Sequence, residues 1–483
     1  MKVFDRQRNE AEMVEQEYDI GMVGLGVMGR NLLLNIADHG YPAAGYDTDP
    51  SKVDALRLEA QEQIIHGAAD LTRFVALLRR PRAVMIMVPA GAPVDGVIKN
   101  LLPHLSPGDV IIDGGNSHFR ETQRRAEQLE ERDIAYLGVG ISGGEHGARH
   151  GPSIMPGGDA GGYERVRPIF EAVAARVNGD SCVSYLGPGA VGHYVKMVHN
   201  GIEYGLMQLI AETYNIMKRG MLISNDQIQR TYREWNREEL NSYLLEITAT
   251  IFGKVDDRTG KHLIDVIRDE AVQKGTGIWT SESALELRAP APVIDMAVAM
   301  RDLSGLKSER LEAHKLLGCP SGNLKSRPEK LLDPLKSALY VSMIITFAQG
   351  MALLRAASKV YGFRLNLSEV AKIWRGGCII RAALLDKIHK GYNDNPSLPN
   401  LLLDRGLAQE IREREADLRS IVCNVSRVGL PAPGLMASLS YLDSYRSSWL
   451  PANLIQAQRD YFGAHTYQRM DAEGAFHTQW DQS

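Results

Sequence analysis

Cysteine is scarce in this chain. Only four occur among 483 residues, at Cys182, Cys319, Cys378 and Cys423. They lie far apart and form no CxxC pair, which argues against a disulfide framework and against a cysteine zinc site. No metal ligand set is expected, and the reducing environment of the cytoplasm is the expected location.

The chain also lacks a strong net charge and a long apolar run. The formal net charge of -4 argues against a general nucleic-acid binder, although a local basic pocket for a small anion remains open. The longest apolar run, 338–354, is interrupted by polar residues and is shorter than the ~20 residues of a membrane span. It predicts a helix buried in a helical domain, so no membrane partner is expected. The charged N-terminus has no apolar stretch typical of a signal peptide.

The length predicts two or three domains. Residues 1–17 form a polar extension, and residues 18–189 alternate between short apolar runs and amphipathic stretches. The runs 20–25, 43–47, 83–88, 110–113 and 134–139 predict buried strands, and 27–39, 50–60, 93–102 and 120–132 predict helices. This alternation is typical of a parallel sheet covered on both faces, which is an α/β Rossmann-like domain.

The pattern changes to helical periodicity at about residue 190, and 190–446 is predicted to be a large all-α domain. The expected helices include 191–219, 243–252, 262–272, 291–302, 332–360 and 407–427. Residues 447–483 show no strong period and are predicted to form a C-terminal tail.

A glycine-rich motif, Gly24-Leu25-Gly26-Val27-Met28-Gly29, directly follows the first predicted strand and opens a helix. Gly24 permits a tight turn, Gly26 lets the backbone approach a pyrophosphate, and Gly29 allows close helix–strand packing. The helix N-terminus supplies amide N–H groups for the anion. The motif predicts dinucleotide binding; an incidental glycine-rich turn is the alternative.

Asp47 ends the second predicted strand, about 20 residues after the glycines. A carboxylate there accepts hydrogen bonds from the adenosine ribose and repels a 2′-phosphate, and no arginine follows. The residues therefore favour NAD over NADP. The alternative is that Asp47 caps the next helix, a role that Asp49 or Ser51 could equally take.

Three further segments carry polar residues suited to chemistry. Residues 113–117 (DGGNS) follow a strand, where ligands collect in doubly wound sheets, and 142–149 (SGGEHGAR) can present backbone N–H groups to an anion. Each alone also suits a turn or a flexible loop. In 196–205 (KMVHNGIEYG), four polar side chains share one helical face: Lys196, His199, Asn200 and Glu203. Gly201 and Gly205 weaken a helix unless something approaches its backbone closely.

With these segments in place, the chain resembles the 6-phosphogluconate dehydrogenase family in its long, decarboxylating form. The resemblance is carried by GLGVMGRNL (24–32), IIDGGNS (111–117), ISGGEHGAR (141–149), KMVHNGIEYG (196–205), QKGTGIWT (273–280), AMRDLSGLKSER (299–310) and RDYFGAHTY (459–467). These segments span nearly the whole chain in the family's order.

The resemblance implies a role for each matching residue. Lys196 is the general base that takes the proton of the 3-hydroxyl, and Glu203 is the general acid that protonates the enediol after CO2 departs. The implied substrate-binding residues are Asn116, Ser142, Gly143, Gly144, His199 and Asn200 for the carboxylate and hydroxyls, and Tyr204, Lys274, Arg301, Arg459 and His465 for the phosphate. From the glycine-rich motif, the strand ends and the resemblance together, the predicted cofactor-binding residues are Gly24, Gly26, Val27, Met28, Gly29, Asp47, Val88 and Asn116. Arg459 and His465 would come from the partner's tail in a homodimer.

This chemistry needs no metal. Oxidation at C3 of 6-phosphogluconate gives a β-keto acid, which loses CO2 if its carbonyl is polarised by a protonated lysine. Lys196 must begin partly neutral to act as a base, so its pKa should be lowered by burial or by neighbouring cations.

The departures from the family pattern fall near the cofactor pocket. Thr48 stands where NADP-using members have an arginine, Gly26 where they have alanine, and Pro89 where they have lysine. NAD is therefore the expected cofactor, with NADP possible. The rival enzyme is another β-hydroxyacid dehydrogenase without decarboxylation, which would be shorter and lack RDYFGAHTY. A non-catalytic dinucleotide-binding protein would be expected to lose Lys196 or Glu203.

Overall fold

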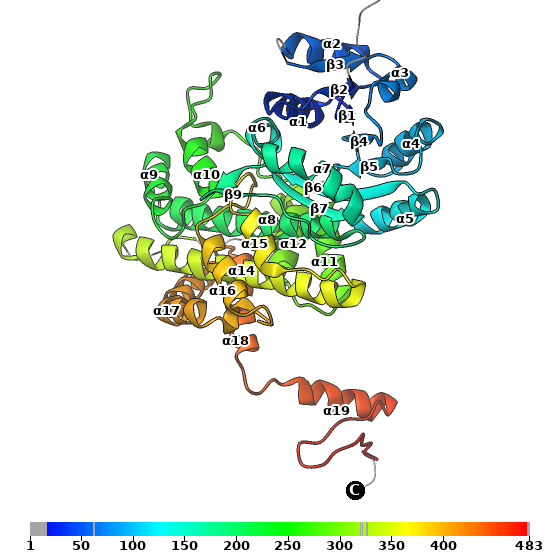
Figure 1. The fold of residues 1–483 in the computed structure, drawn as a ribbon. Helices are drawn as coiled ribbons and strands as arrows, with labels where there is room; N and C mark the ends of the chain where they lie inside the picture. Colours follow the sequence, from blue (N-terminus) through cyan, green and yellow to red (C-terminus); the bar gives the residue numbers. More distant parts are fainter. Residues whose placement is uncertain are drawn as a thin grey trace, which may run out of the picture.

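The computed structural model describes residues 17–60, 63–273, 275–318, 320, 322–324 and 327–480. The predicted extension 1–17 lies outside these residues except for Glu17, and Lys274 lies outside them as well. An α/β domain, a larger helical domain and a tail follow one another along the chain (Figure 1). The predicted fold class, a Rossmann-like domain followed by an all-α domain and a tail, is therefore confirmed.

The α/β domain is built on a seven-stranded sheet with the order β3-β2-β1-β4-β5-β6-β7. The strands are β1 (Ile20–Val23), β2 (Ala43–Tyr46), β3 (Ile65–Ala68), β4 (Ala83–Ile86), β5 (Val110–Asp113), β6 (Ala135–Ser142) and β7 (Ser153–Gly158). All neighbours are parallel except β6 and β7, which pair antiparallel. The five predicted strands are confirmed, while β3 and β7 were not predicted.

Helices cover both faces of this sheet, which explains why its strands read as continuous apolar runs. They are α1 (Val27–Asp38), α2 (Pro50–Glu59), α3 (Leu71–Ala76), α4 (Ala92–Leu101), α5 (Phe119–Glu130), α6 (Gly144–His150) and α7 (Ala160–Val173). Met22 packs into the cluster that contains α1, α2 and α7, whereas the adjacent Val23 packs with α3, α4 and α5. Alternate residues of each strand thus enter opposite cores. A short two-stranded sheet, β8 (Arg176–Val177) and β9 (Asp180–Ser181), follows.

The helical domain begins with α8 (Val191–Asn215), which ends in a single π-helical turn, η2 (Ile216–Gly220). It continues with α9 (Asn225–Trp235), α10 (Tyr243–Gly253), η3 (Leu263–Asp265), α11 (Thr276–Glu286), α12 (Pro292–Gly305), α13 (Lys307–Leu317), η4 (Pro328–Lys330), α14 (Leu332–Tyr361), α15 (Leu367–Ile373), α16 (Leu384–Asp394), η5 (Leu401–Leu403), α17 (Arg405–Val428) and α18 (Pro433–Tyr445). The prediction of a helix over 262–272 was wrong. Only η3 forms there, because Asp269 pairs with Lys307 and Arg310 and ties this segment to α13 as a surface loop.

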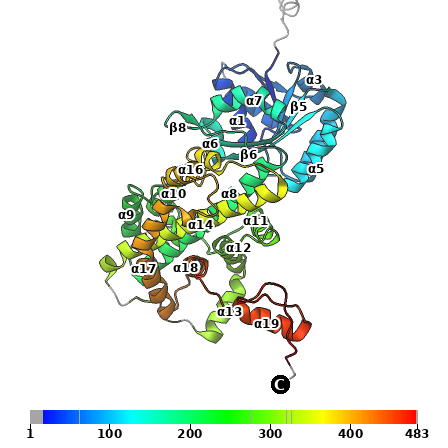
Figure 2. The same ribbon diagram turned by 60° about the horizontal axis from the view of Figure 1, so that its bottom comes forward.

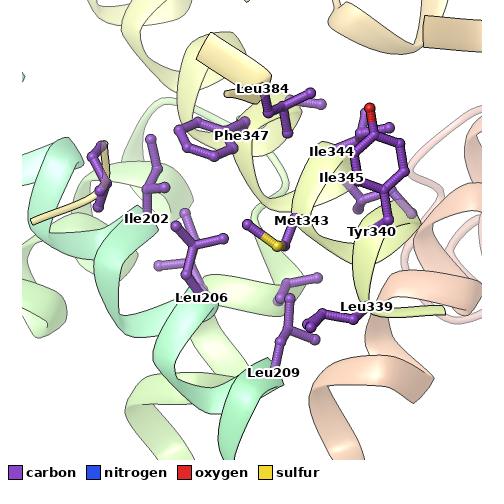
Figure 3. Packing of buried hydrophobic residues seen from close by; sticks show 14 of the residues in the cluster. Ile202, Leu206, Leu209, Leu339, Tyr340, Met343, Ile344, Ile345, Phe347 and Leu384 are labelled. Atoms are coloured by element: carbon purple, nitrogen blue, oxygen red, sulfur yellow. The ribbon is translucent and has the colours of Figure 1, made fainter. Parts of the chain in front are cut away.

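Two long helices, α8 and α14, form the centre of this domain (Figure 3). Ile202 and Leu206 of α8 face Met343 and Phe347 of α14 in a close-packed apolar cluster. By length and composition α14 is the one helix in the described ranges that meets the criteria for a membrane span, yet 89% of its most apolar window is buried inside the protein. The prediction of a buried helix around 338–354 is confirmed.

The first turns of α8 pack directly under the sheet. A Cβ atom at Gly192 would lie 2.1 Å from the carbonyl oxygen of Gly138 in β6 and 2.3 Å from that of Met155 in β7. Because no side chain fits there, the helix backbone lies against the strand backbones. This contact places the next two turns of α8 at the end of β6.

The tail extends away from both domains (Figures 1 and 2). It contains α19 (Ala452–Gly463) and a hairpin-like bridge in which Tyr467 and Phe476 exchange two backbone hydrogen bonds of 2.8 Å. The predicted tail was assigned no helix, so α19 adds to that prediction. Its large apolar side chains are mostly exposed, so α19 lacks the buried stripe by which periodicity identifies a helix.

Candidate active site

A cavity of about 830 Å³ lies where the carboxyl ends of the strands meet the helical domain. Strand ends and loops of the α/β domain form one wall, and α8, α11 and α12 form the other. Predicted site residues that line it are Met28, Val88, Asn116, Ser142, Gly143, Gly144, Lys196, Asn200, Glu203, Tyr204 and Arg301. The structure thus brings together segments that are almost 300 positions apart in the chain.

A chain of hydrogen bonds runs along α8 and back to β6. Lys196 Nζ donates to Asn200 Oδ1 at 2.9 Å, and His199 Nδ1 lies 3.1 Å from the same oxygen. His199 Nε2 lies 3.2 Å from Ser142 Oγ. Lys196, Asn200 and Glu203 line the cavity, whereas His199 is completely buried behind them.

Burial controls the ionisation of these groups. It lowers the pKa of Lys196, an effect that the nearby Glu203 carboxylate opposes. It raises the pKa of Glu203, against the pull of Lys196 and Arg301. The pKa of His199 is held well below its usual value by burial and by Lys196. A lysine shifted toward its neutral form and a glutamate shifted toward its protonated form are what a base and an acid require near neutral pH.

The two glycines of 196–205 are explained by neighbouring helices. A Cβ at Gly201 would lie 2.5 Å from Thr280 Cγ2 of α11, and one at Gly205 would lie 2.6 Å from Thr346 Cγ2 of α14. The expectation that something approaches the backbone closely is met by side chains of the protein itself. Thr280 Oγ1 also donates to the Met197 carbonyl at 2.9 Å. Contacts on the far side of α8 therefore fix the side chains that face the cavity.

Ser142, at the end of β6, and the two glycines after it line the opposite wall. The backbone N–H of Ile379, another lining residue, donates to Ser142 Oγ at 3.4 Å. Gly143 has a φ of 119°, and a Cβ there would lie 2.6 Å from the Gly377 carbonyl oxygen, so only glycine fits. Residues 144–150 form α6, so the reading of this segment as a flexible loop is excluded.

At the far end of the cavity, the guanidinium of Arg301 stacks on the ring of Tyr204, with Cζ 3.5 Å from the ring centroid. Gly277 packs against the other part of this ring, since a Cβ there would lie 2.4 Å from Tyr204 Cε2. The described tail contributes no residue to this cavity. Arg459 and His465 are exposed on α19 and in the turn after it, and neither lines the cavity of its own chain. The helix α19 lies away from the α/β domain (Figure 2).

The glycine-rich turn fits a dinucleotide. Gly24 has a φ of 99°, and a Cβ at Gly29 would lie 2.0 Å from the Gly24 carbonyl oxygen, so these positions serve the tight turn and the close packing. Above Gly26 a Cβ would meet nothing within 4 Å. The N-terminus of α1 is thus open to a bound pyrophosphate, with Val27 exposed beside it.

Asp47 holds this turn instead of capping a helix. Its carboxylate accepts hydrogen bonds from the backbone N–H of Leu25 at 2.8 Å and of Asp49 at 2.9 Å. Asp49 is the N-cap of α2, bonding to Ser51 N at 3.0 Å. The alternative role of Asp47 as a cap is therefore excluded. Lys52 Nζ lies 3.4 Å from Asp47 Oδ2 and is the cation that faces this carboxylate.

Sequence reasoning missed a buried network behind the 113–117 loop. Arg125 is 1% exposed and donates to Ser117 Oγ, to the Gly91 carbonyl and to Asp95. Asp113 accepts from Ser117 Oγ at 2.6 Å and from Gly115 N at 3.1 Å. The network fixes two loops of the cofactor cleft. The pattern of apolar residues cannot predict this network. In the sequence, Arg125 has the same appearance as the exposed basic residues of an amphipathic helix.

Comparison with known proteins agrees with this geometry. Residues 19–187 match the NAD binding domain of 6-phosphogluconate dehydrogenase, and residues 192–480 match the 6-phosphogluconate dehydrogenase C-terminal domain. The NADP(+)-dependent, decarboxylating 6-phosphogluconate dehydrogenase of Bacillus subtilis is 49% identical over 462 residues, which cover 95% of this chain and 98% of the relative. Decarboxylating 6-phosphogluconate dehydrogenase 1 of Oryza sativa is 50% identical over 466 residues, covering 95% and 97%.

A solved structure matches over the same extent. The Plasmodium falciparum 6-phosphogluconate dehydrogenase superposes with a TM-score of 0.94 at 42% identity, covering 96% of this chain and all of that one. Shorter dehydrogenases without the long helical domain cannot match over this length. The chain belongs to the 6-phosphogluconate dehydrogenase family.

Proposed function

We propose that this protein catalyses the oxidative decarboxylation of 6-phospho-D-gluconate to D-ribulose 5-phosphate and CO2. The observation that carries this proposal is the polar face of α8, where Lys196 and Glu203 line one cavity with opposite shifts of pKa. The bound nicotinamide would supply the acceptor for the hydride that leaves C3. Every other step can be assigned to side chains of this chain.

Lys196 is proposed as the group that handles the proton of the 3-hydroxyl. Its neutral form takes that proton as the C3–H bond breaks, and the resulting ammonium polarises the new carbonyl. The C1–C2 bond then breaks, CO2 leaves, and its electron pair forms the enediol. Asn200 supports this role because its Oδ1 accepts a hydrogen bond from Nζ and holds the amine at the cavity wall.

Glu203 is proposed as the acid that protonates the carbon from which CO2 departed. Its raised pKa favours the protonated form, and its position one helical turn beyond Asn200 places it on the same wall. Asn116, Ser142, Gly143, Gly144 and His199 would hold the carboxylate and hydroxyls. Tyr204, Arg301 and Lys274 would hold the phosphate, with Arg301 supplying a planar fork for two oxygens.

For the cofactor, we propose binding over Gly24, Gly26 and the N-terminus of α1, with NAD preferred over NADP. The carboxylate of Asp47 supports this preference because it directly follows β2, at the position where folds of this kind bind the adenosine ribose. Lys52 opposes the preference for NAD, because among the described residues it is the basic side chain that pairs with the Asp47 carboxylate and could attract a 2′-phosphate. The named NADP(+) dependence of the Bacillus subtilis relative makes this a distinguishing property to measure.

We propose a homodimer in which the tail of one chain completes the cavity of the other. The exposed apolar side chains of the tail support this, because surfaces of this kind are usually covered by a partner.

Membrane and nucleic acid are not proposed as partners, no metal is proposed for the reaction, and the cytoplasm remains the proposed location. Among the described residues, Cys182, Cys378 and Cys423 are free thiols.

The proposal is tested by incubating the protein with 6-phosphogluconate radiolabelled at C1 and either NAD or NADP. Equal amounts of labelled CO2, reduced nucleotide and ribulose 5-phosphate are expected. A kcat/KM at least about tenfold higher with NAD, equivalent to about 1.4 kcal/mol, would support the Asp47 assignment. Oxidation without CO2 release would instead identify a dehydrogenase that does not decarboxylate, and a preference for NADP would assign the 2′-phosphate to Lys52.

A further inference from the structure

The tail keeps its shape with hardly any buried side chain. Over residues 447–480 Asp460 is the single buried residue, with 0% exposure, while Leu454, Ile455 and Phe462 are at least 60% exposed. A segment without an apolar core cannot rely on the hydrophobic effect for a fixed conformation. In this segment the hydrogen bonds of the buried Asp460 carboxylate hold the chain together instead of an apolar core.

Four groups from two separate parts of the tail surround this carboxylate, one in the turn after α19 and three near the end of the described chain. Oδ1 of Asp460 accepts from Thr466 N at 3.0 Å and lies 2.9 Å from His477 Nδ1. Oδ2 accepts from Thr478 N and from Trp480 Nε1, both at 3.0 Å. Asp460 thus ties α19 to the turn that follows it and to the end of the described chain.

The turn that Asp460 holds contains His465. Its two neighbours, Ala464 and Thr466, have φ values of 48° and 58°, which non-glycine residues rarely adopt. Ala464 N donates to the Asp460 carbonyl at 2.9 Å, and Thr466 N donates to the Asp460 carboxylate. Both unusual residues are therefore anchored to Asp460. Arg459 precedes Asp460 in α19, with its guanidinium exposed and bonded to Gln456 at 3.0 Å.

We propose that Asp460 is a positioning residue, which fixes Arg459 and His465 relative to each other so that they bind the phosphate of 6-phosphogluconate in a second copy of this chain. This inference rests on the proposed function and on the proposed role of the tail. Arg459 lies at the end of a helix and His465 in an unusual turn, and the Asp460 carboxylate and backbone connect the two. Ordering them before the chains meet removes an entropic cost from substrate binding.

The first test is Asp460→Asn, which replaces one acceptor oxygen by an NH2 group that opposes the donors. The KM for 6-phosphogluconate should rise about tenfold or more, as expected when two side chains must be ordered on binding. The kcat and the KM for the nucleotide should stay near the wild-type values, because α8 and the glycine-rich turn are untouched. The Trp480 fluorescence should change, since its indole N–H loses its acceptor.

Asp471→Asn is the matched control. Asp471 also lies in the tail and pairs with Arg469, but its side chain is 67% exposed. It does not connect α19 to the turn that contains His465. Wild-type KM values are expected. If Asp460→Asn fails to fold, Trp480→Phe and His477→Ala each remove one hydrogen-bonding group from the Asp460 carboxylate and should raise the same KM by smaller factors.

A mixing experiment separates this inference from the proposed function. Lys196→Met chains have an intact tail and a defective site, and Asp460→Asn chains have the reverse. In a hybrid dimer, the intact tail of the Lys196→Met chain completes the intact site of the Asp460→Asn chain. That site should therefore regain the wild-type KM for 6-phosphogluconate. A wild-type KM in Asp460→Asn with altered Trp480 fluorescence, or a loss confined to kcat, would overturn the positioning role alone. Absence of CO2 release by the wild-type protein would overturn the proposed function itself.

Discussion

The catalytic face of α8 and the tail each contain a carboxylate shielded from solvent, that of Glu203 in part and that of Asp460 completely, in opposite environments. Desolvation raises the pKa of Glu203, whose carboxylate accepts no hydrogen bond from the described residues and has His199 Nδ1 at 3.9 Å. Burial pushes the pKa of Asp460 upward too, but hydrogen bonds led by that of His477 outweigh it and lower the pKa to about 2. A carboxylate without donors keeps a proton that it can transfer, whereas one surrounded by donors stays ionised and holds structure.

The largest effect should follow from Lys196→Met, which removes the ionisable group of the catalytic face and keeps a side chain of similar length. We expect kcat to fall by about 10³-fold or more, because both proton removal and carbonyl polarisation are lost. Steady-state assays with nucleotide binding as the control provide the measurement. Turnover above a few per cent of wild type would show that Lys196 is not the base.

Glu203→Gln should lower kcat by about 10²-fold to 10³-fold, since an amide cannot donate the proton to carbon. It should also change the pH profile. Lys196 must be neutral to accept a proton, so activity rises as pH increases through its lowered pKa. Because the Glu203 carboxylate raises the pKa of Lys196, its removal should move this limb to lower pH. The basic limb due to ionisation of Glu203 should disappear, and a profile identical in shape to wild type would contradict the assignment.

Gly205→Ala tests the packing that supports the catalytic face. The new Cβ would lie 2.6 Å from Thr346 Cγ2, so we expect a loss of about 1–3 kcal/mol in the free energy of unfolding. Denaturant titration measures it. Adding Thr346→Ser removes that methyl group and should recover part of the loss. Ala472→Val, in the exposed tail, should change the stability by less than about 0.5 kcal/mol.

Asp47 is a third carboxylate to compare, held by two backbone N–H groups directly after β2. Asp47→Asn should lower the ratio of kcat/KM for NAD to that for NADP by about tenfold, or roughly 1.4 kcal/mol. The amide neither repels a 2′-phosphate nor accepts as strongly from a ribose hydroxyl. An unchanged ratio would remove Asp47 from the determinants of cofactor preference.

The sequence predicted the parts of the molecule that depend on local spacing. The strands of the sheet follow from short continuous apolar runs, the polar face of α8 follows from the period of 3.6 residues, and the glycine-rich turn follows from its motif. The tail was described only as aperiodic, because the Asp460 hub joins residues 6 to 20 positions apart and buries no apolar stripe. The false helix at 262–272 arose because periodicity does not register the ion pairs that Asp269 makes with α13.

The contact of Gly192 with the strand backbones has a consequence for how this protein can be divided. Family matches split the chain between residues 187 and 192, and cloning at that point would produce two fragments. The sheet fragment would lose the helix that covers β6 and β7, and the helical fragment would expose Val191 and His193, which are buried against Gly157 of β7 and Gly138 of β6 in the intact protein. A fusion that exchanges nucleotide-binding domains between family members should therefore place its junction after the first two turns of α8, so that the donor domain keeps the helix against which it folds.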